Sequence, residues 1–126
     1  MSQKTVIQHI ALQYANKEQA DIFFKEILGL DLVKNFKLYK ELSKPIFGKP
    51  GDVDVFVYSN EESVFEIFIT NSKTEYIFNH VCIKVSDKEQ FVKKCEKNNL
   101  KPFFVKKGDK KLLFVRDYAD NLYEIK

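Results

Sequence analysis

The stretch His9-Ile10-Ala11-Leu12 recurs 71 residues later as His80-Val81-Cys82-Ile83. The same offset places Lys17-Glu18-Gln19 on the identical Lys88-Glu89-Gln90. A match at one fixed offset is the signature of an internal repeat. The chain is therefore predicted to contain two copies of one structural module.

Each copy begins with an alternating apolar segment and continues into an amphipathic one. Asn16 precedes the first amphipathic stretch and Asp87 the second, and both residue types cap helix N-termini. The pattern predicts helices over about residues 17–28 and 88–98. Gly29 follows the first of these, where a left-handed helix cap is expected.

Short strand candidates separated by turn residues follow each predicted helix. They cover about residues 31–38, 52–58 and 63–70 in the first copy, and about 102–106, 111–116 and 122–126 in the second. Each copy therefore reads strand, helix, strand, strand, strand. This order predicts an α+β fold of two βαβββ modules, at about 5–71 and 76–126, within a single domain of residues 1–126.

The segment 39–51 is the one long connection in the chain. It contains two prolines and two glycines, and the second copy has nothing of equal length. We expect a loop here, and such loops often cover or line sites. Tyr39 and Phe47 lie in this segment and could cover a site.

One polar residue interrupts the apolar pattern in four of the strands. Side chains alternate between the two faces of a sheet, so each of these residues opposes the face that would pack on a helix. They are His9 and Glu66 in the first copy and His80 and Glu124 in the second. Only two histidines occur in the chain, and chance would place the second at the matching position about once in 125 placements. Two imidazoles and two carboxylates related by a pseudo-two-fold axis are expected to converge on one point.

Such a group would suit a divalent cation. Burying two carboxylates without partners would cost several kcal/mol per ion, and a divalent metal or an opposing lysine would offset that cost. The neutral imidazoles and two carboxylates together carry a charge of about −2. Their N and O donors suit Ni, Co, Zn, Fe or Mn, and the affinity order does not choose among them. The alternative is a water-filled groove edge without metal.

Length and composition define the broad class. The chain has 126 residues, of which 44% are apolar and 14% aromatic, so it can bury one real core, and extensive disorder is excluded. Its longest apolar runs have four residues, far short of the roughly 20 that cross a bilayer. The first residues lack the apolar run of a signal peptide, so we expect a cytoplasmic protein.

Charge and cysteine content exclude further classes. The net charge is only +3, and the lysines are spread along the chain, which argues against nucleic-acid binding. Cys82 and Cys95 lack the spacing of a zinc finger or a redox pair, so we expect both to be reduced thiols.

Two longer motifs complete the pattern. Phe23-Phe24-Lys25-Glu26-Ile27-Leu28-Gly29-Leu30 is similar to F-Y-x-x-x-L-G-[LMF], with Phe24 in place of Tyr. The segment Phe114-Val115-Arg116-Asp117-Tyr118-Ala119-Asp120-Asn121-Leu122-Tyr123-Glu124 is similar to F-x-x-D-P-D-G-N-x-x-E. It departs from that pattern at residues 118–120, and Asp120 can adopt the left-handed turn conformation that glycine usually supplies.

With these motifs the whole chain resembles the vicinal oxygen chelate superfamily, which holds glyoxalase I, bleomycin-resistance proteins, extradiol dioxygenases, fosfomycin-resistance enzymes and methylmalonyl-CoA epimerase. The resemblance implies a curved mixed sheet around a central cavity. The order of His9, Glu66, His80 and Glu124 is similar to the metal set of bacterial-type glyoxalase I. It implies a lyase or isomerase in which a metal binds the vicinal oxygens of a hemithioacetal and stabilises an enediolate. Glu124, or else Glu66, would move the proton between carbons.

The substrate contacts are less defined. Glutathione-using members hold carboxylates with Arg, Lys and Asn, and this chain has one arginine, Arg116, which could instead form a salt bridge within its own turn. Cys82 shares the inner face with His80 and could touch a ligand, although a buried thiol is the commoner finding. Phe56 and Phe68 could line an apolar pocket, although core packing is the simpler role for each.

Three functions stay open at this point. The first is the glyoxalase-type enzyme, and the second is a non-catalytic protein of the bleomycin-resistance type that sequesters a drug or metabolite. The third is a metal-bound member with other chemistry, such as epimerisation of an acyl-CoA or thiol transfer to an epoxide. The resemblance also implies a homodimer, and the sequence leaves open whether one chain or two would supply the ligands of each centre.

Overall fold

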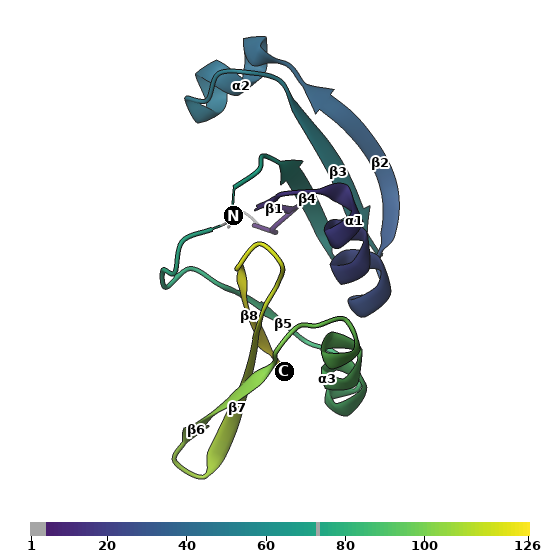
Figure 1. Ribbon diagram of the computed structural model, residues 1–126, viewed down its shortest axis with the longest axis vertical. Coiled ribbons are helices and arrows are strands. Elements are labelled where there is room, and N and C mark those ends of the chain that lie inside the picture. Colours follow the sequence, from purple (N-terminus) through teal and green to yellow (C-terminus); the bar gives the residue numbers. More distant parts are fainter. Residues whose placement is uncertain (1–4, 73) are drawn as a thin grey trace, which may run out of the picture.

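The computed structural model describes residues 5–72 and 74–126. Two modules follow one another along the chain and lie at opposite ends of the molecule (Figure 1). The first contains β1 (Ile10–Tyr14), α1 (Lys17–Ala20), η1 (Asp21–Ile27), β2 (Asp31–Leu38), α2 (Lys40–Phe47), β3 (Val53–Ser59) and β4 (Val64–Ile69). The second contains β5 (Val81–Ile83), α3 (Lys88–Lys97), β6 (Phe103–Lys107), β7 (Lys110–Arg116) and β8 (Leu122–Ile125).

Each module forms a four-stranded mixed sheet. The strand order is β1-β4-β3-β2 in the first sheet and β5-β8-β7-β6 in the second. In both, the first and last strands of the module pair in parallel and the other neighbours are antiparallel. The repeated βαβββ order predicted from the sequence is therefore confirmed, but it builds two separate sheets and not one continuous sheet.

Side-chain caps begin both long helices. The Asn16 side chain accepts a hydrogen bond from the backbone N–H of Gln19 at 2.9 Å, and Asp87 accepts one from Gln90 at 3.0 Å. The first helix continues from α1 into the wider π-helical turns of η1. It ends at Gly29, whose φ of 76° is the left-handed conformation expected there.

The segment between β2 and β3 differs from the prediction. It was expected to be a loop, but it contains the eight-residue helix α2 despite Pro45 inside it. The buried Ser43 hydroxyl donates to the carbonyls of Lys49 and Gly51, and these bonds tie the helix to the turn that follows it. These local bonds, together with the packing of Phe47 on β4, override the preference of proline for irregular structure.

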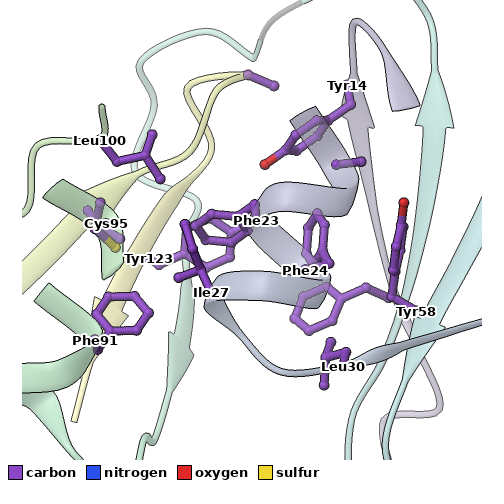
Figure 2. Close-up of a cluster of buried hydrophobic side chains, with 14 of the residues drawn as sticks. Tyr14, Phe23, Phe24, Ile27, Leu30, Tyr58, Phe91, Cys95, Leu100 and Tyr123 are labelled. Carbon is purple, nitrogen blue, oxygen red and sulfur yellow. The ribbon is translucent and has the colours of Figure 1, made fainter. Parts of the chain in front are cut away.

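One hydrophobic core joins the two modules. Helix η1 lies between the first sheet and α3, and the buried side chains of both modules meet around it (Figure 2). Phe23 of η1 lies 4.9 Å, centroid to centroid, from Tyr123 of the second sheet. The buried members of the core are Tyr14, Ala20, Phe23, Phe24, Ile27, Leu30, Tyr58, Phe65, Ile67, Phe91, Cys95, Leu100, Leu113, Val115, Ala119, Tyr123 and Ile125.

Helices α1 and η1 cover one face of the first sheet and α3 covers the equivalent face of the second sheet, and we call the opposite face of each sheet the inner face. Ile10 pairs with Phe65 and Leu12 with Ile67, and these residues pack toward the helices. Ala11 pairs with Glu66 on the inner face. No helix within the described residues is long and apolar enough to cross a membrane.

Candidate metal centre

The first module brings His9 and Glu66 together. His9 directly precedes β1, and Glu66 lies in β4, the parallel neighbour of β1. The distance from His9 Nε2 to Glu66 Oε1 is 3.5 Å, and the two side chains are 47% and 23% exposed. The imidazole and carboxylate therefore form a partly solvent-exposed pair at the inner face of the first sheet.

The second module builds the equivalent pair. His80 directly precedes β5, Glu124 lies in β8, and His80 Nε2 is 3.9 Å from Glu124 Oε1. His80 Nδ1 lies 2.9 Å from the carbonyl oxygen of Phe78. A carbonyl only accepts, so this contact places the proton on Nδ1 and leaves the Nε2 lone pair of the neutral ring facing Glu124. Metal-binding histidines are commonly oriented in this way.

The two pairs remain separate within one chain. Among residues 5–72 and 74–126, no three His, Cys, Asp or Glu side chains come close enough to hold one metal ion. The four predicted ligands thus form two pairs, one on each sheet. The prediction that they converge on one point within a single chain is therefore wrong.

Hydrogen bonds to the buried Asp117 carboxylate order the turn between β7 and β8, which precedes Glu124. The buried Asp117 Oδ1 accepts from the backbone N–H groups of Ala119 and Asn121, each at 2.9 Å, and Oδ2 accepts from the Tyr123 hydroxyl at 2.8 Å. Burial raises the pKa of Asp117, while the bonds from Tyr123 and Asn121 act in the opposite direction. Asp120 has φ 67°, so the expected left-handed turn forms without glycine.

Arg116 lies on the inner face of β7, two residues beyond Phe114, which pairs with Glu124. Its Cζ lies 3.6 Å from the centroid of the Tyr76 ring, and its Nη1 donates to the Asp120 carbonyl at 2.8 Å. These contacts hold the guanidinium at a pocket of about 500 Å³. Arg116 is thus near the second pair in the sheet, but its group is already engaged in the turn.

The remaining candidates fall on both faces. Cys82 is exposed and pairs with Glu124, so it shares the inner face as predicted. Phe68 also lies on the inner face, two residues after Glu66. Phe56 requires a correction, because it pairs with Ile67 on the helix side and lies 5.6 Å below the Lys17 ammonium. Strand alternation therefore turns Phe56 away from the surface that carries Glu66.

The structure also contains a pocket whose lining residues were not predicted as a group from the sequence. It measures about 800 Å³ and lies between the inner face of the first sheet and α2 with its following turn. Gln13 in its wall has the same strand parity as His9, so the sequence did carry a signal for this residue. The described lining residues are Ala11, Leu12, Gln13, Ser43, Phe47, Lys49, Pro50, Gly51, Asp52, Val53, Phe68, Ile69, Thr70, Asn71 and Ser72.

Comparisons with known proteins identify the fold. No protein-family model matches the chain. No curated protein matches it either. Among solved structures it is similar to a glyoxalase family protein from Bacillus cereus, with 17% identity, a TM-score of 0.73 and coverage of 99% of this chain and 96% of that one.

Two further solved structures carry named activities. The trypanothione-dependent glyoxalase I of Leishmania major has 15% identity and a TM-score of 0.67, over 97% of this chain and 86% of its own. A variant of the fosfomycin resistance protein FosX from Listeria monocytogenes, complexed with Mn(II) and 1S,2S-dihydroxypropylphosphonic acid, has 11% identity and a TM-score of 0.73, over 98% and 90%. At these identities the likeness establishes the fold alone, which the chain shares with these glyoxalase and FosX structures.

Proposed function

We propose that this protein is a metal-dependent lyase or isomerase of the glyoxalase type, acting on a small substrate with two vicinal oxygens. The observation that carries the proposal is the pair of equivalent histidine–glutamate contacts, one at the inner face of each sheet. The fold supports it, since the FosX variant of the same fold was solved with Mn(II) and a vicinal diol.

The donor atoms suit a divalent metal. Two donors that bind one metal at about 2.1 Å lie roughly 3 to 3.5 Å apart. The His9–Glu66 contact of 3.5 Å falls at the edge of this range, and the His80–Glu124 contact of 3.9 Å is close to it. Two neutral imidazoles and two carboxylates would neutralise one divalent charge, and the set fits Ni, Co, Zn, Fe or Mn.

A second copy of the chain would complete each centre. One chain supplies two pairs that do not meet, so a homodimer in which each inner face meets the other module of its partner would form two four-ligand centres. Apolar exposure beside the second pair supports this arrangement. Phe78, whose carbonyl orients His80, is 98% exposed, and Phe103 on the same inner face is 43% exposed. A partner that covers these rings would remove apolar surface from water.

When bound, the metal supplies Lewis-acid polarisation of the two substrate oxygens. The protein's own contribution is proton transfer. A Glu124 carboxylate oxygen would take the proton from one substrate carbon and return it to the adjacent one, with Glu66 as the second candidate. The Glu124 side chain is 19% exposed, and the Lys126 ammonium lies 4.0 Å from its Oε2.

Metal content tests the proposal directly. Elemental mass spectrometry of untagged protein is expected to find near-stoichiometric divalent metal, and a His9→Ala/His80→Ala variant with matching circular dichroism is expected to lose it. Turnover of the methylglyoxal–thiol hemithioacetal is then expected in the metal-bound protein and is expected to fall by about 10²-fold or more in Glu124→Gln. Less than about a tenth of an equivalent after incubation with Ni, Co, Zn and Mn would contradict the proposal.

A protein that binds a small molecule without changing it is the second candidate. The pocket of about 800 Å³ on the first sheet favours it, since this volume lies in the usual range for ligand sites. In that case His9→Ala and Glu124→Ala would leave ligand binding unchanged. For the enzyme, both substitutions are expected to weaken binding of a chelating substrate analogue.

A further inference from the structure

The pocket under α2 adjoins the first histidine–glutamate pair. Ala11 lines the pocket and is the pairing partner of Glu66, and Phe68 lines it two residues further along the same strand. Residues two apart on a strand lie on the same face about 6.6 Å from each other. A molecule held by its oxygens at His9 and Glu66 would therefore extend directly into this pocket.

We propose that the pocket binds an uncharged aromatic group of the substrate, packed against the paired rings of Phe47 and Phe68. The inference rests on the proposed function, because the reacting end of the same molecule would lie at the His9–Glu66 pair. It adds the chemical class of the part that does not react.

The aromatic wall supports this class. Phe47 of α2 and Phe68 of β4 make an edge contact, with centroids 5.5 Å apart and an interplanar angle of 73°. Val53 of β3 extends the apolar wall beside them. Phe47 is still 51% exposed, so a third ring placed against the pair would gain edge and face contacts and cover apolar surface.

Charge excludes a polyanionic group. Among the described lining residues, Lys49 supplies one ammonium and Asp52 one carboxylate, so the wall has no net charge. Asp52 is itself engaged, accepting from the backbone N–H of Lys40 at 2.9 Å. The chain's one arginine is in the other module, stacked on Tyr76. Carboxylates are usually held by arginine forks or clustered cations, so a tripeptide dicarboxylate is not the expected occupant.

The pocket belongs to the first module and is preformed. The Ser43 hydroxyl, in a residue that is 3% exposed, bonds to the carbonyls of Lys49 at 3.1 Å and Gly51 at 2.6 Å. These bonds fix the turn that forms the outer wall. In the second module β6 ends at Lys107 and β7 begins at Lys110, so that connection has no room for a helix like α2.

The test uses two chelators, acetohydroxamate and phenylacetohydroxamate, that share one metal-binding head and differ by an uncharged phenyl group. Calorimetric titration of the metal-loaded full chain is expected to show the phenyl compound binding at least about tenfold tighter. Phe47→Ala is expected to abolish this preference and leave acetohydroxamate affinity unchanged. Ile46→Ala is the matched control, because Ile46 is the neighbouring residue of α2, is 61% exposed and does not line the pocket.

A third probe separates the pocket from the metal. Phenylacetamide has the ring without the chelating head, and with metal-free protein it is expected to shift amide NMR signals of Ala11 and Phe68 in the wild type but not in Phe47→Ala. These shifts in a protein that refuses metal would support the pocket and contradict the proposed enzyme. Equal affinities for the two hydroxamates, or the same loss in Ile46→Ala as in Phe47→Ala, would overturn the pocket and leave the metal centre standing.

Discussion

The Asp117 carboxylate has a structural task in the turn that precedes Glu124. It is 3% exposed and accepts hydrogen bonds from two backbone N–H groups, the Asn121 amide and the Tyr123 hydroxyl. A buried carboxylate is costly unless its oxygens are satisfied, so each donor counts. The turn is therefore expected to be sensitive to the loss of any one of them.

Two buried tyrosines allow this expectation to be tested. Tyr123→Phe removes a hydroxyl that donates to Asp117 at 2.8 Å, and the free energy of unfolding is expected to fall by about 1 to 3 kcal/mol. Tyr14→Phe removes a buried hydroxyl that makes no hydrogen bond of good geometry among the described residues, although burial and the nearby Asp117 carboxylate raise the pKa of Tyr14, and it is expected to cost less than Tyr123→Phe. Urea unfolding followed by circular dichroism measures both.

The two variants serve as controls for each other, because each removes one oxygen from a fully buried ring of the same core. An equal loss of stability in both variants would show that the hydrogen bond from Tyr123 to Asp117 makes no particular contribution to the free energy of unfolding.

The sheet face on which a residue lies was predicted correctly where the alternation of side chains along a strand was used, and wrongly where it was not. Alternation placed Glu66 and Glu124 on the inner faces, and the structure confirms these placements through their pairing with Ala11 and Cys82. Phe56 was grouped with other aromatics without regard to parity, and it lies on the helix side. The orientation of His80 by the Phe78 carbonyl depends on a turn whose path the sequence did not indicate.

At the scale of elements, the first helix is anchored to its sheet by one carboxylate. Asp21 accepts hydrogen bonds from the Lys17 ammonium at 2.7 Å and from the Tyr58 hydroxyl of β3 at 2.6 Å. Burial acts to raise the pKa of Asp21, but these two bonds outweigh it and the pKa is lowered. The unfolded chain therefore binds the proton more readily than the folded chain, and ionised Asp21 contributes stability above its unfolded pKa.

Asp21→Asn is expected to lower the free energy of unfolding by about 1 kcal/mol at pH 7. The difference from the wild type should be fully present above about pH 5 and should shrink as the pH falls through the folded pKa of Asp21, because the wild type then loses the same charge. Thermal or urea unfolding between pH 7 and pH 3 measures it. Glu18→Gln, which removes a carboxylate one turn earlier, serves as the control, and a pH-independent difference would contradict the assignment.

Helix α2 shows the limit of local sequence patterns. Its proline and the glycines after it are typical of a loop, and the prediction followed them. The helix forms because Ser43 is buried against its own following turn and Phe47 packs on Phe68, which is distant in sequence. By contrast, β2 spans Asp31–Leu38 as predicted, since its ends are set by local turn residues.

At the scale of the whole molecule, metal centres shared between two chains can be tested by mixing two inactive variants. If each centre takes His9 and Glu66 from one chain and His80 and Glu124 from another, His9→Ala and His80→Ala chains refolded together would form mixed dimers with one intact centre. Random pairing gives about half mixed dimers, so metal content and activity should return to about a quarter of the wild-type value per chain.

Each variant refolded alone is the control and is expected to stay near zero. If the refolded mixture also stays near zero in activity and in metal content, each centre takes its ligands from one chain only.

The relative placement of the modules is what the sequence did not indicate. The repeat predicted both modules and the inner-face positions of the four polar residues, because these depend on local alternation and short turns, but it also predicted that the four residues would converge on one point. The docking of η1 against α3, with Phe23 against Tyr123, depends on long-range packing between side chains that would be equally apolar in other arrangements. That packing decides that the two pairs stay apart within one chain.

The unequal exposure of the two thiols allows a chemical label to be attached beside the His80–Glu124 pair. Cys95 is fully buried, and burial raises its pKa to about 12, whereas Cys82 is exposed beside Glu124. In the unpaired chain, a maleimide dye or nitroxide would therefore attach at one position without any engineered cysteine. Its emission or line width would report directly on events at the inner face of the second sheet, and the native sequence thus carries its own attachment point for a spectroscopic reporter.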